Sequence, residues 1–132
     1  MMEPVDYLLK FDKEFYYPIK SRQKESTIRI NSKPLDIGDY VVAYFPELKK
    51  GLLVEIMGHY AKRLKDLSHK EAKCEGYYHP DLLKHELHNI YPNLDDDAYV
   101  YFYRFDYVNP NHPEYNEGII NDFLRDKGVD LE

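Results

Sequence analysis

One stretch of ten residues decides how this chain is read: Ser21-Arg22-Gln23-Lys24-Glu25-Ser26-Thr27-Ile28-Arg29-Ile30. It follows a helix-like segment and leads into a strand-like one. Because side chains alternate faces along a strand, Thr27 and Arg29 are expected on one face. Ile28 and Ile30 are then expected in a core on the other face. Lys24 precedes the strand and can fold back over the polar face, which is either a compact reactive site or a solvated polar surface.

The segments around this stretch alternate between strand and helix patterns. Strands are predicted at residues 5–11, 24–31, 40–45, 52–60 and 99–107, and helices at residues 12–20, 69–75 and 80–91. Ser68 and Glu71 match a capping box, and Gly76 is a natural helix stop. Several β-rich runs with helices between them predict an α+β fold, built on a small mixed β-barrel with inserted short helices.

Two patterns identify candidate core faces. Residues 83, 87 and 90 (Leu83, Leu87 and Ile90) recur at helical spacing and predict a core-facing stripe. The strand at residues 99–107 carries aromatic side chains at every second position, with Val100 and Phe102 on the other face. Such a row of aromatics can stack nucleic-acid bases, but we interpret it as barrel core.

The composition changes at residue 109, so we divide the chain into a barrel domain at residues 1–108 and a tail at residues 109–132. The tail contains a predicted amphipathic helix at residues 114–127, with Gly128 as its stop. Its apolar face is formed by Ile119, Ile120, Phe123 and Leu124. We expect this helix to pack on or beside the barrel, and the alternative is that it docks a partner protein.

Length and charge restrict the class of protein. The chain has 132 residues, of which 43% are hydrophobic, enough for a single core. Its net charge of -6 argues against a protein that coats long DNA or RNA, because such proteins are usually basic. It leaves room for a local basic pocket that holds a nucleoside or a short RNA.

Other features indicate the compartment. Cys74 is the sole cysteine, so an internal disulfide is excluded and a reducing compartment is favoured. No stretch approaches the roughly 18 apolar residues of a membrane span. The first six residues lack the pattern of a signal peptide. We therefore expect a cytoplasmic, monomeric protein without membrane contact.

Residues 22–29 resemble the signature of the ASCH family, Gly-x-Lys-x-x-Thr-x-Arg. Lys24, Thr27 and Arg29 stand at the signature spacing, and Arg22 stands where the family usually has glycine. ASCH domains resemble the PUA RNA-binding domains in fold, so the resemblance implies a PUA-like barrel. Residues 67–92 are also similar to the corresponding part of the small bacterial N(4)-acetylcytidine amidohydrolases.

This resemblance implies a catalytic set formed by Lys24, Thr27 and Glu75, without a metal or cofactor. Thr27 would attack the acyl carbonyl, Lys24 would accept its proton and Glu75 would protonate the leaving nitrogen. Arg29 would bind the substrate or the developing oxyanion. The alternative is a non-catalytic RNA-binding module, in which Lys24 and Arg29 hold phosphate. The implied partner is accordingly a nucleoside or a short RNA.

The remaining reactive side chains are weaker candidates. Cys74 neighbours Glu75 but faces about 100° away on a helix, so we interpret it as an inert thiol. His85 and His88 share a helix face but lack a third convergent ligand for a metal. Residues 95–97 are three aspartates without the interleaved pattern of a calcium loop, and we expect a solvated turn.

Overall fold

The computed structural model describes residues 7–111 and 117–128. Five strands form one mixed sheet in the order β1-β3-β4-β5-β2. The strands are β1 Leu8–Lys10, β2 Ser26–Arg29, β3 Tyr40–Phe45, β4 Lys50–Arg63 and β5 Tyr99–Tyr107. The helices are α1 Tyr16–Lys20, α2 His69–Glu75, α3 Pro80–Ile90 and α4 Glu117–Asp126, with 3-10 turns at Lys13–Phe15 and Leu64–Asp66.

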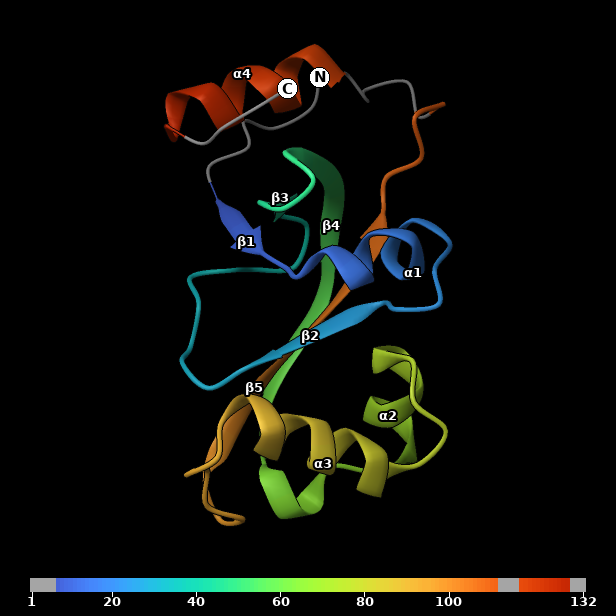
Figure 1. Cartoon of the computed structure of the whole chain (residues 1–132), viewed down its shortest axis with the longest axis vertical. Helices are drawn as coiled ribbons and strands as arrows, with labels where there is room; N and C mark the ends of the chain where they lie inside the picture. Colours follow the sequence, from blue (N-terminus) through green and yellow to red (C-terminus); the bar gives the residue numbers. More distant parts are fainter. Residues whose placement is uncertain (1–6, 112–116, 129–132) are drawn as a thin grey trace.

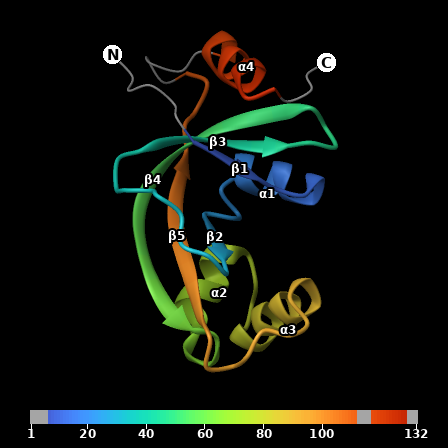
Figure 2. The same ribbon diagram turned by 90° about the vertical axis from the view of Figure 1, so that its left-hand side faces the viewer.

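The sheet curves into a half-barrel, which confirms the predicted α+β class and its mixed sheet (Figures 1 and 2). β1 pairs with β3 in parallel, and the other neighbouring strands are antiparallel. β1 and β2 are the two edges of the sheet, so the half-barrel remains open. Figure 2 shows β4 and β5 as a curved wall, with α2 and α3 near one end of these strands and α4 near the other.

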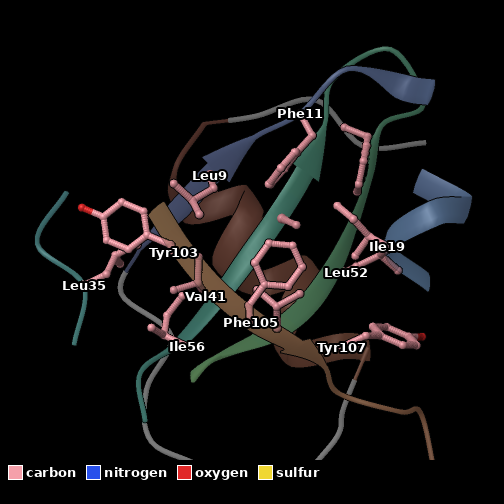
Figure 3. Packing of buried hydrophobic residues seen from close by; sticks show 13 residues of the cluster. Leu9, Phe11, Ile19, Leu35, Val41, Leu52, Ile56, Tyr103, Phe105 and Tyr107 are labelled. Atoms are coloured by element: carbon pink, nitrogen blue, oxygen red, sulfur yellow. The ribbon is translucent and has the colours of Figure 1, made fainter. Parts of the chain in front are cut away.

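β5 supplies residues to two separate cores, one on each face. Tyr103, Phe105 and Tyr107 pack with β1, β3 and α1 in the first core (Figure 3). Val100 and Phe102 pack under α2 and α3 in the second. The aromatic row is therefore core, as predicted for most of its length; Tyr99, at its start, is exposed.

A β-bulge in β4 explains how this strand serves both cores. Its register against β5 shifts between Ile56 and Gly58. Ile56 packs in the first core, whereas Tyr60 packs against the second although both residues are even-numbered. The extra residue, Met57, reverses the alternation of faces along the strand. The prediction of one regular strand at residues 52–60 missed this bulge, and β4 extends further in both directions.

α4 covers the outer face of β3 and β4. Ile120, Phe123 and Leu124 pack against Val42, Tyr44 and Leu53. β3 is thereby buried on both faces. Residues 114–116 of the predicted helix lie outside the described residues, and the division into domains at residue 108 stays a prediction.

Two predicted core positions are wrong. Ile30 follows the last paired residue of β2 and is 37% exposed, because no strand partner continues there. Ile90 occupies the last turn of α3 and is 51% exposed, while Leu83 and Leu87 are buried as expected. The first strand is also shorter than residues 5–11, of which residues 5 and 6 lie outside the described part. Among the described residues, no helix has the length and apolar character needed to cross a membrane.

Candidate active site

The turn before β2 is held by backbone hydrogen bonds from three directions. The amides of Gln23 and Lys24 both donate to the Pro18 carbonyl of α1. The Glu25 amide donates to the Cys74 carbonyl at the end of α2, at 2.7 Å, and the Glu25 carbonyl accepts from β5. The turn therefore cannot move independently of α1, α2 and β5, which fixes the position of the Lys24 side chain.

Arg22 begins this turn with a φ of 63°, the left-handed conformation that favours glycine. Its guanidinium donates to the Tyr107 carbonyl at 2.9 Å and lies 5.6 Å from the centre of the Tyr107 ring. These contacts offset the strain of the backbone. Arginine thus adopts here the left-handed conformation that favours glycine.

Lys24 and Glu75 form a buried ion pair. Lys24 Nζ lies 3.2 Å from Glu75 Oε2, and the two side chains are 7% and 6% exposed. The same carboxylate oxygen accepts a short hydrogen bond from Ser26, 49 residues away in the sequence. Lys24 Nζ also lies 4.9 Å from the centre of the Phe15 ring. Lys24 is therefore paired with the carboxylate of Glu75 and is not part of a solvated polar surface.

Thr27 and Arg29 form a second pair, on the face of β2 opposite to Ser26. Arg29 Nε donates to Thr27 Oγ1 at 3.0 Å, and Arg29 Nη2 donates to the Lys10 carbonyl. Burial lowers the pKa of the Arg29 guanidinium, although Tyr91 and Glu75 partly oppose this shift. An arginine stays charged under such conditions. Because Arg29 donates to Thr27, the Thr27 hydroxyl keeps its own proton for another acceptor.

These two pairs line one cavity of about 430 Å³, within the size range of small-molecule sites. Aromatic and aliphatic side chains form most of its wall: Phe11, Phe15, Ile28, Pro46, Tyr77, Leu83, Leu87, Ile90 and Tyr91. Ile90 therefore borders the cavity and not a core. Three further carboxylates, of Asp12, Glu47 and Glu86, also line it. The cavity suits a flat, largely uncharged ligand with polar groups at its edges.

The four residues singled out from the sequence thus converge on this cavity. Within the described part of the chain, no hydrogen bond joins Thr27 to Lys24 or Glu75. Ser26 was missed by sequence reasoning, although its position two residues from Ile28 puts it on the face toward α2. Tyr77 and Phe15 were also missed, because their neighbours along the chain do not distinguish them.

A smaller hollow of about 230 Å³ reaches the ion pair from a second side. Gln23, Gly76, Phe15 and Tyr77 line it together with Lys24 and Glu75. Gly76 ends α2 with a φ of 92°, as predicted for a helix stop. A side chain at this position would be strained, so the glycine lets the end of α2 approach the turn before β2.

Other candidate residues lie elsewhere. Cys74 is half-buried outside the cavity, and burial raises the pKa of its thiol. Across residues 7–111 and 117–128, no cluster of three or more His, Cys, Asp or Glu side chains is arranged to hold a metal ion. His88 Nε2 lies 3.6 Å from Asp96 Oδ1.

The structure resembles several solved proteins whose sequences are distant. An ASCH domain from Lactobacillus crispatus has a TM-score of 0.63 and 13% identity, over 79% of this chain and 78% of that one. A protein from Enterococcus faecalis has a TM-score of 0.60 and 15% identity, over 88% of each chain. A variant ASCH protein from Zymomonas mobilis has a TM-score of 0.59 and 8% identity, over 89% and 95%.

The chain shares its fold with these proteins, whereas the comparisons by sequence find no relative. No protein-family model and no curated protein matches this sequence. Identities of 8–15% establish a shared architecture and not a shared activity. The signature motif at residues 22–29 predicted the architecture of an ASCH domain. This prediction is confirmed, because the chain has the fold of an ASCH domain.

Proposed function

We propose that this protein is an amidohydrolase that removes an acyl group, such as acetyl, from the exocyclic amine of modified cytidine nucleosides. One observation carries the proposal: Lys24, Thr27 and Glu75 line the same cavity, and Lys24 and Glu75 share an ion pair there. Amide hydrolysis needs a nucleophile, a base and an acid, and these three side chains supply all of them.

The ion pair is one proton transfer away from the reactive form. When a ligand excludes water from the cavity, moving a proton from Lys24 to Glu75 produces a neutral amine and a neutral acid. Neutral Lys24 is then the base and protonated Glu75 the acid. The Ser26 hydrogen bond holds the Glu75 carboxyl in position during both states.

The first half of the reaction forms an acyl-enzyme. Thr27 Oγ1 attacks the acyl carbon while Lys24 Nζ accepts the hydroxyl proton, and Arg29 faces the resulting oxyanion. The bond from the acyl carbon to the cytidine N4 then breaks, and Glu75 donates its proton to N4. Cytidine leaves, with Lys24 as ammonium and Glu75 as carboxylate.

The second half consumes water and restores the enzyme. Glu75 accepts a proton as water attacks the acyl carbon of the threonine ester. The ester bond to Thr27 Oγ1 breaks, Lys24 returns a proton to this oxygen, and the carboxylic acid leaves. Thr27 must approach Lys24 for these steps, and such catalytic contacts often tighten only when the substrate binds.

The cavity wall supports a nucleoside as substrate. Its aromatic residues, Phe11, Phe15, Tyr77 and Tyr91, suit a pyrimidine ring, and carboxylates at Asp12, Glu47 and Glu86 suit ribose hydroxyls. Together with Glu75 these carboxylates outnumber the three cations of the lining, Lys10, Lys24 and Arg29, which disfavours phosphate. Lys24 is buried and paired, so the alternative of an RNA-binding module that uses Lys24 and Arg29 for phosphate is less well supported.

The test is incubation of the purified protein with N(4)-acetylcytidine, followed by quantification of cytidine and acetate. We expect turnover, and a loss of about 10²- to 10⁴-fold in kcat for Thr27→Ala and for Lys24→Ala. The matched control is Lys20→Ala, which removes an exposed lysine of α1 outside the cavity and should leave the rate unchanged. No turnover of any N4-acylated cytosine derivative would contradict the proposal.

A further inference from the structure

The hollow of about 230 Å³ beside the Lys24–Glu75 pair, here called the small hollow, has no role yet in the proposed reaction. Four residues line both the small hollow and the larger cavity: Phe15, Lys24, Glu75 and Tyr77. Four others line the small hollow but not the cavity: Glu14, Pro18, Gln23 and Gly76. The ion pair therefore stands at the boundary between two spaces of different size.

Cleavage of an N4-acyl bond at the ion pair requires space on both sides of that bond. Thr27 and Arg29 line the larger cavity and not the small hollow, so the acyl carbon and its oxyanion belong in the cavity. A nucleoside is too large for the small hollow, since benzene alone occupies an engineered cavity of about 150 Å³. The cytidine therefore takes the larger cavity, and the acyl chain is left to extend past Lys24 and Glu75 into the small hollow.

Contacts between its walls hold the small hollow in shape. The amides of Gln23 and Lys24 donate to the Pro18 carbonyl at 2.8 and 3.0 Å. A Cβ atom on Gly76 would lie 3.4 Å from the Gln23 carbonyl oxygen, so the end of α2 lies directly against the turn before β2. Lys24 Nζ lies 4.9 Å from the centre of the Phe15 ring. Walls joined in this way give the preorganisation that a selective subsite needs.

The lining of the small hollow suits an uncharged chain. Phe15, Pro18 and Tyr77 are half-buried and give it apolar walls. Its charged residues are Lys24 and the carboxylates of Glu14 and Glu75, so the lining carries one net negative charge. Such a lining favours methylene groups and repels an acyl chain that ends in a carboxylate. By comparison with the benzene cavity, the volume holds a chain of about six carbons.

We propose that the small hollow is the acyl subsite of the enzyme and that it accepts an unbranched, uncharged acyl chain longer than acetyl. The acyl subsite rests on the proposed function, since that function places the scissile bond at Lys24, Thr27 and Glu75. Two residues that take no part in bond cleavage, Glu14 and Gln23, then set which acyl group is removed. The preferred substrates are cytidines that carry a butyryl to hexanoyl group on N4.

The experiment compares kcat/KM for N4-acetyl-, N4-butyryl-, N4-hexanoyl- and N4-succinylcytidine, with released cytidine as the readout. Each methylene group that leaves water contributes about fourfold, so butyryl should be cleaved at least about tenfold more efficiently than acetyl. Hexanoyl should match or exceed butyryl. Succinyl has the length of butyryl but ends in a carboxylate, and its kcat/KM should be about tenfold lower than that of butyryl.

Two variants test the residues that line the small hollow but not the cavity. Gln23→Trp narrows the hollow and should lower the hexanoyl-to-acetyl ratio of kcat/KM about tenfold or more. Glu14→Lys reverses a charge in the lining and should raise the succinyl-to-butyryl ratio about tenfold. The matched control, Glu117→Lys, makes the same charge reversal at an exposed residue of α4 that lines neither space, and it should change neither ratio. Gln23 and Glu14 are both exposed, and each variant tests the subsite if the other is unstable.

The outcomes separate the acyl subsite from the hydrolase activity itself. Cleavage of acetylcytidine as efficient as that of the longer acyl groups, a hexanoyl preference that Gln23→Trp leaves intact, or an equal effect of Glu117→Lys would each overturn the subsite while the hydrolase stands. If no acylcytidine is cleaved, the proposed function fails, and titration calorimetry of the same compounds decides the subsite. Tighter binding of the hexanoyl compound that Gln23→Trp abolishes would then support it, and equal affinity for all four would overturn it.

Discussion

Two glutamates of α2 are both buried, yet their carboxylates have different surroundings. Glu71 is 0% exposed and accepts hydrogen bonds from the Tyr60 hydroxyl, Lys62 Nζ, and the Ser68 amide and hydroxyl. Glu75 contacts Ser26 and Lys24 and borders a cavity. The Glu71 carboxylate is saturated with donors, whereas Glu75 has a neighbour with which it can exchange a proton. A carboxylate whose oxygens both accept hydrogen bonds from fixed donors stabilises the fold. A carboxylate with fewer donors that borders a cavity is available for chemistry.

The sharpest test of this comparison is the Glu75→Gln variant. Glutamine keeps the shape and can still accept from Ser26, but it cannot donate a proton as an acid. Under the proposed mechanism, kcat for acetylcytidine hydrolysis should fall about 10²- to 10⁴-fold. Steady-state kinetics, with circular dichroism to verify folding, measure this. Activity close to that of the unaltered protein would remove Glu75 from the mechanism.

Glu71→Gln should lower the stability of the protein more than Glu75→Gln does, and its activity less. Lys62 would lose its buried partner, and an amide nitrogen would face donors, so we expect the free energy of unfolding to fall by about 3 kcal/mol. Denaturant unfolding measures it. The loss in Glu75→Gln should be smaller, because fewer hydrogen bonds are broken. If Glu75→Gln is the less stable of the two, the distinction between a structural and a functional carboxylate fails.

Glu71 should also make stability depend on pH. Burial alone would raise the pKa of this carboxyl, but hydrogen bonds from Tyr60, Lys62 and Ser68 outweigh it and lower the pKa from 4.5 to about 2. Because the pKa of Glu71 is lower in the folded state than in the unfolded state, the ionised carboxylate stabilises the fold at pH values above about 4.5. This stability is lost as the pH falls from about 4.5 to about 2. The loss should amount to about 3 kcal/mol in unfolding curves across this range. Glu71→Gln should lack this component of the pH dependence.

Gly51→Ala tests packing at the opposite end of the sheet. A Cβ atom there would lie 2.8 Å from Val42 and 3.1 Å from Leu124, so α4 or Val42 must shift. We expect a loss of about 1–3 kcal/mol from overpacking. Hydrolysis should be unchanged, because the residues that the new Cβ meets, Val42, Ile120 and Leu124, do not line the cavity. Thermal unfolding and kinetics on the same sample measure both. A drop in activity without unfolding would show that α4 is coupled to the cavity.

Tyr60→Phe should produce the smallest effect. It removes the 2.6 Å hydrogen bond to Glu71 and leaves the stacked contact with Phe102 in place. Glu71 keeps its other donors, and Tyr60 is half-buried so that water can replace its hydroxyl, which predicts a loss of about 1 kcal/mol. Denaturant unfolding measures it, together with an upward shift of the acid transition. An unchanged acid transition would contradict the role of this hydroxyl.

Some of the site was predictable because its chemistry is local. The spacing of Lys24, Thr27 and Arg29 along a short strand identified three of the cavity's polar residues. The capping box of Ser68 and Glu71 identified the start of α2, but nothing in the sequence distinguished Glu71 from an ordinary cap residue. The Glu71 carboxylate is bound by Tyr60 and Lys62, which belong to β4.

The sequence by itself determined the elements, because hydrophobic alternation and helix caps depend on neighbouring residues. It predicted β5 at Tyr99–Tyr107 and the start of α3 at Pro80 as the structure has them. Only the tertiary structure decided which side chains meet. Ser26 and Glu75 contact each other across 49 residues because α2 packs against the turn before β2. The bulge at Met57 and the exposure of Ile30 likewise arise from packing between distant segments, which no local pattern encodes.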